Sequence, residues 1–160
     1  MNALRKYLNK GLEIITVALL AFMVVLGVWQ IVTRYVFNNP SVITEELLLY
    51  SFVWMGLLGS AYVFGKREHM RMSFFAEKFS EKVQFGISIA TEAIVLATAA
   101  LVLVWGGMNI VSLAMGQISP ALNVQMGYLY MALPLSGIIT IIYNVLNISD
   151  MLKNKGQKSN

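Results

Sequence analysis

Long apolar runs separated by short polar segments dominate the chain. A bilayer core of about 30 Å requires roughly 20 apolar residues in helical conformation. Four runs reach that length, and three of them contain no charged residue at all. We therefore predict four transmembrane helices, at about residues 12–35, 45–65, 83–107 and 127–148. The predicted fold is an all-α integral membrane protein that forms one membrane domain over residues 1–160.

The end of the third helix has to be predicted from turn residues, because residues 93–149 contain no charge. Gly106 and Gly107 are followed by Gly116 and Pro120, and these residue types interrupt helices. We therefore expect the third helix to end at Gly107 and a polar connection to follow it.

Composition supports the membrane prediction and narrows the chemistry. Hydrophobic residues make up 58% of the chain and charged residues 12%, whereas about a quarter of a soluble domain is charged. Cysteine is absent and His69 is the single histidine, which excludes disulfides, thiolate chemistry and paired imidazole ligands. The sequence contains no nucleophile–base pair, phosphate-binding loop or metal-ligand cluster, so we expect no enzyme activity, no cofactor and no metal.

The distribution of basic residues predicts the orientation. All of the 12 Lys and Arg residues except Arg34 fall in the N-terminal segment, the loop after the second helix or the C-terminal tail. Positively charged loops stay in the cytoplasm, so both termini and the middle loop are predicted to be cytoplasmic, in a bacterial inner membrane. The net charge of +4 is thereby explained by topology, and no nucleic-acid partner is expected.

A charged corner is predicted at the outer end of the first two helices. Arg34 ends the first helix, and Glu45 and Glu46 begin the second, where the helix dipole favours acidic side chains. Because the loop between them is short, Arg34 could pair with either carboxylate. Two interpretations are open: a structural clamp, or a docking patch for a protein on the outer side.

The middle loop has the pattern of an interfacial helix at about residues 70–80. Its apolar positions form a stripe opposite charged residues, which favours a helix lying along the inner headgroup layer. The residues predicted to contact this interface or its lipid are Lys66, Arg67, His69, Arg71, Phe74, Phe75 and Phe79.

Glu92 lies about ten residues into the third predicted helix, near the middle of the membrane. A charge there costs on the order of 2.5 kcal/mol or more, so the side chain must face protein. It is either a proton or sodium site, or a protonated or hydrogen-bonded carboxyl group that contacts a neighbouring helix.

Small residues predict where helices pack, because helices in lipid associate through close contact. One predicted surface lies on the second helix and one on the third, and each suits packing within the bundle or against a partner. Their residues are Gly56, Gly59, Ser60, Ala93, Ala97 and Ala100. Pro134 is expected to kink the fourth helix and to free a backbone carbonyl.

An ordered set of motifs gives these features a family resemblance. It consists of Arg34-Tyr35-Val36-Phe37, Thr44-Glu45-Glu46-Leu47, the Lys66–Met72 loop and the Tyr128–Gly137 segment. With the four-helix topology, this set resembles the small membrane subunit, the DctQ type, of tripartite ATP-independent periplasmic (TRAP) transporters. Ile43 stands where the family often has tryptophan, and Glu68 stands where it often has glycine.

The resemblance implies a division of labour. In such systems a periplasmic binding protein captures an organic acid, such as a C4-dicarboxylate or a sialic acid, and a large membrane subunit moves it in a sodium-driven step. The resemblance implies that the small subunit packs beside the large one as a scaffold and helps to receive the binding protein. The alternative is an autonomous, proton-coupled four-helix multidrug exporter. Glu13 is too shallow for that mechanism, and Glu92 lies on the third helix rather than the first.

Overall fold

The chain is almost entirely helical over the residues that the structure, a computed structural model, describes: residues 2–66 and 81–157, with side chains for 3–66 and 83–151. The elements are α1 (Asn2–Tyr35), α2 (Val42–Lys66), α4 (Glu81–Thr98), the π-helix η1 (Ala99–Gly106), α5 (Gly107–Ala114), α6 (Met126–Tyr130) and α7 (Ala132–Gln157). Four of the resulting helical segments are long and apolar enough to cross a membrane. The predicted all-α membrane fold is confirmed.

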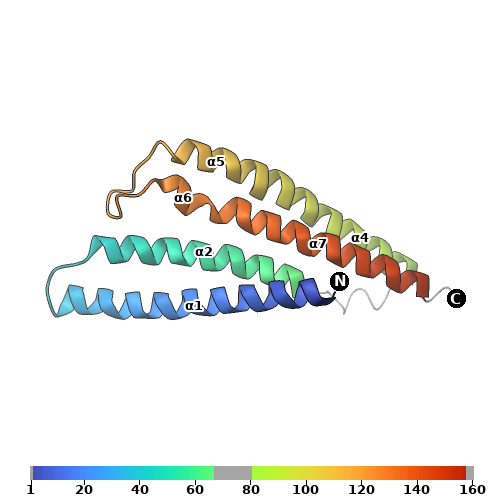
Figure 1. Cartoon of the computed structure of the whole chain (residues 1–160), viewed down its shortest axis with the longest axis horizontal. Helices are drawn as coiled ribbons and strands as arrows, with labels where there is room; N and C mark the ends of the chain where they lie inside the picture. Colours follow the sequence, from blue (N-terminus) through green and yellow to red (C-terminus); the bar gives the residue numbers. More distant parts are fainter. Residues whose placement is uncertain (1, 67–80, 158–160) are drawn as a thin grey trace.

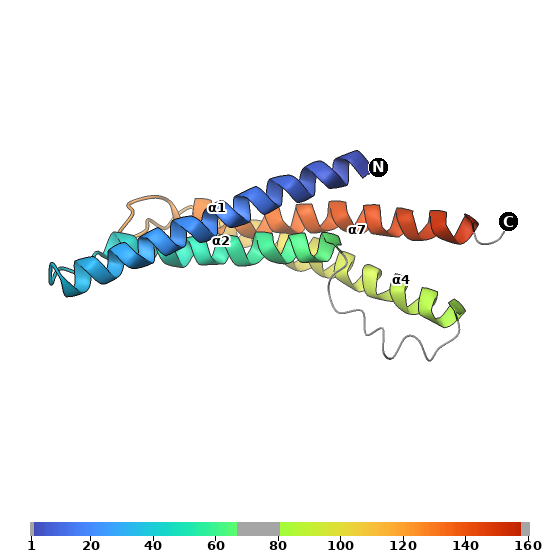
Figure 2. The same cartoon turned by 90° about the horizontal axis from the view of Figure 1, so that it is seen from below.

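The four membrane helices lie side by side as a row (Figure 1). α2 packs between α1 and α7, and α7 packs between α2 and the continuous helix formed by α4, η1 and α5. α1 crosses α2 at an angle, and both chain termini lie at the same end of the row (Figure 2). We call this end the terminus end, and the opposite end, with residues 36–41 and 115–125, the loop end.

Burial is concentrated in α7. In the 18-residue apolar window of the span Met126–Met151, which joins α6 and α7, 39% of the residues are buried, compared with none in that of α1. The core is correspondingly small: Leu12, Leu58 and Tyr143 form its buried cluster. Most large apolar side chains therefore remain on the outside, where lipid or a partner protein must cover them.

The third membrane helix is longer than predicted. It continues through Gly106 and Gly107 and ends at Ala114, so its expected end at Gly107 was wrong. These glycines do not break the helix, and Gly107 allows a close approach instead: a Cβ atom there would lie 3.0 Å from the Cβ of Leu133. The turn to the next helix comes after Ala114, and Asn123 helps form it with a left-handed φ of 58°, which asparagine tolerates.

The fourth membrane helix is interrupted at Met131, between α6 and α7. Pro134 has no backbone N–H, so the carbonyl of Tyr130 loses its usual partner four residues along. The helix resumes with a bond from the Leu135 N–H to the Met131 carbonyl, at 3.2 Å. The disturbance expected from Pro134 thus lies one turn before the proline.

Candidate functional site

Glu46 on α2 connects that helix to the loop between α5 and α6, at the loop end of the row. Its Oε1 accepts hydrogen bonds from Ser119 Oγ at 2.5 Å and Tyr50 Oη at 3.3 Å. Its Oε2 accepts from the backbone N–H groups of Ala121 and Leu122, both at 3.1 Å. One carboxylate therefore receives four donors, three of them from the loop that connects α5 and α6.

The loop around Ser119 is built to present these donors. An isolated bridge pairs Ile118 with Gln125, and the Ser119 N–H donates to the Val124 carbonyl at 2.8 Å. The Ser119 side chain is fully buried, and its Oγ also accepts from the Leu122 N–H at 3.1 Å. The carboxylate and the loop form a single unit, which we call the loop-end clasp: Tyr50, Glu46, Ser119, Ala121 and Leu122.

The predicted pairing of Arg34 with Glu45 or Glu46 is not formed in the part of the chain that the structure describes. Arg34 and Glu45 are exposed, and the ion pair in this part of the chain joins Arg5 to Asp150 instead. Glu46 uses both oxygens on the α5–α6 loop, which satisfies it without a cation. Arg34 and Glu45 consequently remain on the surface of the loop end.

A second hydrogen bond joins α2 to the α5–α7 side of the row, farther from the loop end than Glu46. Trp54 on α2 donates from its indole Nε1 to the carbonyl of Leu129, at 2.9 Å. Leu129 lies in the short helix α6, just before the interruption at Met131. α2 and α6 are therefore joined by a hydrogen bond, and an indole N–H in a membrane needs such a partner.

Glu92 contacts the central helix α7. The amide Nδ2 of Asn144 donates to the Glu92 Oε2 at 2.7 Å and to the Glu92 backbone carbonyl at 2.9 Å. Asn144 is 2% exposed, and its Oδ1 is buried without a hydrogen-bond partner among the described groups. The side chain that membrane energetics requires to face protein thus faces a buried amide of the neighbouring helix.

A polar network closes the terminus end. Arg5 on α1 forms an ion pair with Asp150 on α7, with 3.1 Å between Nη1 and Oδ2, and its Nη2 donates to the Asn147 side chain. One turn along, the Tyr143 hydroxyl donates to Asn9 Oδ1 at 2.6 Å. α1 and α7 are thereby connected by side chains at this end, although their backbones lie on either side of α2.

The small residues that the sequence singled out are not closely packed against other residues that the structure describes. A Cβ atom added at Gly56 or Gly59 would meet nothing within 4 Å. Ser60, Ala93 and Ala97 are exposed, and Ala100 is half-buried. The surfaces on α2 and on α4–η1 are therefore largely uncovered by the described residues, which gives no support to packing within the bundle.

Other glycines make the close contacts. A Cβ at Gly137 would lie 2.7 Å from Leu103 Cβ, one at Gly65 would lie 2.6 Å from the Tyr143 ring, and one at Gly127 would lie 2.6 Å from the sulfur of Met115. Composition does not distinguish these glycines from Gly56 and Gly59. Their roles depend on which face of the helix meets a neighbour.

Several predicted interfacial residues lie outside the described part of the chain. They are Arg67, His69, Arg71, Phe74, Phe75 and Phe79, together with the amphipathic segment at about residues 70–80. Lys66 is described, and its ammonium lies 4.5 Å from the centre of the Tyr62 ring.

The sequence prediction missed the polar face of α7. Ser136, Thr140, Tyr143, Asn144 and Asn147 are all buried. Their positions repeat every three or four residues, which places them on one side of a helix. Polar side chains on one face of an apolar membrane helix indicate contact with other helices, so this spacing was a usable signal.

Taken together, the fold and the polar contacts define a multi-pass helical membrane protein whose internal polar groups join helices to one another. The family comparison gives it a more specific place. The DctQ component of the tripartite ATP-independent periplasmic transporters matches residues 23–154, and the chain belongs to this family. It is accordingly a protein of the bacterial inner membrane.

Individual relatives of the chain carry the names of subunits of the same type of transporter. The chain is 29% identical to the sialic acid TRAP transporter small permease protein SiaQ of Vibrio cholerae over 153 residues, 96% of this chain and 88% of the relative. It is also 29% identical over 139 residues to a putative TRAP transporter small permease protein of Haemophilus influenzae, covering 87% and 86% of the two chains. A third match, 35% identical over 81 residues, joins 49% of this chain to 13% of the sialic acid TRAP transporter permease protein SiaT of Haemophilus influenzae.

Proposed function

We propose that this chain is the non-catalytic small subunit of a sodium-coupled, binding-protein-dependent transporter for an organic acid. In this proposal it packs against a large membrane subunit and widens the stationary part of the assembly. The named substrate of the relatives SiaQ and SiaT favours a sialic acid as cargo. The large subunit and the periplasmic binding protein are the expected partners.

The arrangement of the helices carries the proposal. Over the residues that the structure describes, the four helices form a row, and each inner helix is packed between its two neighbours. Such a slab offers apolar faces to its surroundings but no central space through which a solute could pass. This supports a role beside a transport pathway rather than around one.

The intramembrane polar groups support the same conclusion. Glu92 is bonded to Asn144, and the other buried polar groups of α7 bond to their own helix or to α1. A transport site needs groups that exchange partners with a solute or ion, whereas these groups hold helices together. The exporter alternative has no observation in its favour.

The large membrane subunit is inferred as a partner from the similarity to SiaT and from the exposed small residues of this chain. In SiaT, the segment similar to this chain is a small part of a longer permease. The open small-residue surfaces on α2 and on α4–η1 allow another helix to approach closely. Lipid covers such surfaces less well than a fitted helix does, so they are suitable contacts for a large subunit.

The loop end is the proposed outer side, because the basic residues cluster toward the other end. Glu45 and Arg34 are exposed there and take no part in the loop-end clasp. They are therefore the side chains of the charged corner that remain able to meet a binding protein.

Co-purification and reconstitution test the proposal. The chain, expressed with its large subunit and extracted in mild detergent, should retain that subunit stoichiometrically. Proteoliposomes with both subunits should take up labelled sialic acid when a sodium gradient and the binding protein are supplied, and proteoliposomes with this chain alone should not. Transport of any solute by the isolated chain, or purification without a large subunit under these conditions, would contradict the proposal.

A further inference from the structure

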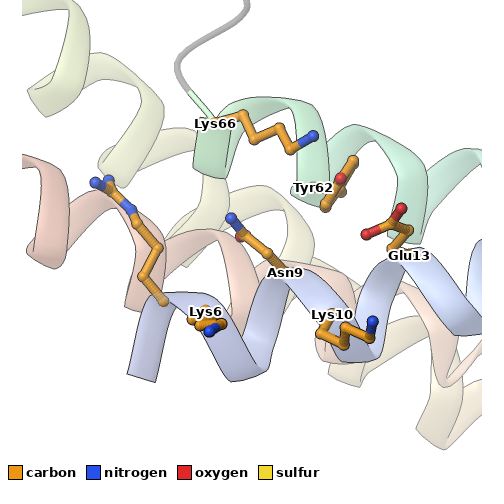
Figure 3. A pocket seen from close by; sticks show the side chains of 7 residues that line it. Lys6, Asn9, Lys10, Glu13, Tyr62 and Lys66 are labelled. Carbon is orange, nitrogen blue, oxygen red and sulfur yellow. The ribbon is translucent and has the colours of Figure 1, made fainter. Parts of the chain in front are cut away.

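A basic pocket lies between α1 and α2 at the terminus end, away from both the clasp and Glu92. It has a volume of about 420 Å³ and is lined by Arg5, Lys6, Asn9, Lys10, Glu13 and Lys66, with Tyr62 at its wall (Figure 3). Tyr62 and Lys66 come from α2, and the other lining residues come from α1. Nothing in the proposed function uses this pocket.

Its lining is strongly cationic. Four lining residues are basic and one is acidic. Arg5 is already bound to Asp150 and Asn147, but Lys6 and Lys10 are exposed and form no ion pair with another residue that the structure describes. Lys66 extends over the Tyr62 ring toward the pocket, as Figure 3 shows. Several ammonium groups that line one pocket favour an anion with several oxygen atoms.

The surroundings are those of a membrane interface. The apolar span of α1 includes the pocket residues at its start, and exposed apolar side chains continue along the same helix, at Ile14 and Val17. Tyr7, which is 77% exposed, lies between Lys6 and Lys10 in the sequence, and tyrosine is typical of the headgroup level. A bound lipid could therefore place its anionic headgroup in the basic pocket and its apolar chains against the exposed apolar side chains of α1.

We propose that this pocket binds the phosphate headgroup of an anionic phospholipid from the leaflet at the terminus end. Lys6, Lys10 and Lys66 hold the phosphate oxygens, and the acyl chains extend along the exposed apolar face of α1. The Asn9 Oδ1 already accepts from Tyr143, so its amide Nδ2 can donate to a phosphate oxygen, and Glu13 can accept hydrogen bonds from headgroup hydroxyls. A basic residue near a membrane surface changes affinity for an anionic lipid by about fivefold, so three lysines together should contribute roughly a hundredfold.

Thermal stability with short-chain lipids tests the site. Short-chain phosphatidylglycerol added to the full-length chain in neutral detergent should raise its melting temperature, and short-chain phosphatidylcholine should not. Replacement of Lys6, Lys10 and Lys66 by glutamine should shift the phosphatidylglycerol titration to roughly a hundredfold higher concentration. Replacement of the same three residues by arginine keeps the charge and should preserve the response, which guards against a loss caused by misfolding.

A charge-matched variant separates a pocket from general attraction. Lys153, Lys155 and Lys158 replaced by glutamine remove the same total charge from the C-terminal tail and should leave the titration unchanged. Equal loss in this tail variant, or an equal response of the wild type to phosphatidylcholine, would overturn the proposal. Inorganic phosphate at the same concentration should give no stabilisation; an equal effect would identify a free-anion site and overturn the lipid assignment.

Discussion

Gly137 gives the sharpest test of the packing that holds this row of helices together. It lies within α7 and is buried against η1. A Cβ atom there would be 2.7 Å from Leu103 Cβ, 2.9 Å from Val104 Cγ2 and 3.2 Å from the Val104 backbone nitrogen. Two of these three atoms belong to or adjoin the backbone, so neither can rotate out of the way. Gly137→Ala must therefore move α7 away from η1.

The expected cost follows from overpacking, which typically destabilises a close-packed interior by about 1–3 kcal/mol. Alanine also favours helix over glycine by about 1 kcal/mol, and this gain partly hides the loss. Gly56→Ala provides the matched control, because Gly56 lies within α2 and a Cβ there meets nothing within 4 Å. The difference between the two alanine variants removes the propensity gain and isolates the packing cost.

Thermal unfolding of the purified chain in mild detergent is the assay, followed by tryptophan fluorescence. For a chain of this size each kcal/mol corresponds to about 2–4 °C. Gly137→Ala should therefore melt about 2–12 °C below Gly56→Ala, which itself should equal or exceed the wild type. If the two variants melt at the same temperature, the close contact between α7 and η1 is not what stabilises the row.

The remaining predictions concern polar groups and topology. Glu46→Ala should lower the melting temperature more than Glu46→Gln, because the glutamine oxygen still accepts from the loop N–H groups and the Ser119 hydroxyl can reverse its bond; equal losses would argue against the loop-end clasp. Glu92→Leu should cost about 0.6–1.7 kcal/mol through its lost interhelical bond, whereas Glu92→Gln should be nearly neutral, and abolished uptake in both would indicate an ionisable coupling site instead. Because the chain has no cysteine, Asn39→Cys and Leu4→Cys give clean topology probes. An impermeant maleimide should label the first in intact spheroplasts and the second only after lysis, and the reverse pattern would invert the proposed orientation.

The helices themselves were predictable because the physics behind them is local. Apolar length predicts a membrane span, and the four spans need no knowledge of tertiary contacts. The end of the third span was not predictable in this way. Glycine is a helix breaker when exposed to water, but in a membrane helix it also lets a neighbour approach, and Gly107 has the second role against Leu133.

The partner of Glu46 could not be inferred from the sequence for a different reason. Arg34 is near in sequence and opposite in charge, which made it the natural candidate. Three of its four donors lie 73 to 76 positions away, and two of these are backbone N–H groups, which every non-proline residue carries. Only the fold of the α5–α6 loop reveals that these groups point toward the carboxylate.

The order of the helices in the row has a consequence for biosynthesis. α1 with α2, and α4–η1–α5 with α6–α7, are two hairpins, and each joins its own helices through a turn at the loop end. We expect the α2–α7 surface between them to form last, after both hairpins have entered the bilayer. The two hairpins, synthesised as separate chains, should therefore be able to recombine in the cell. A break in the chain between them should slow assembly without changing the final structure.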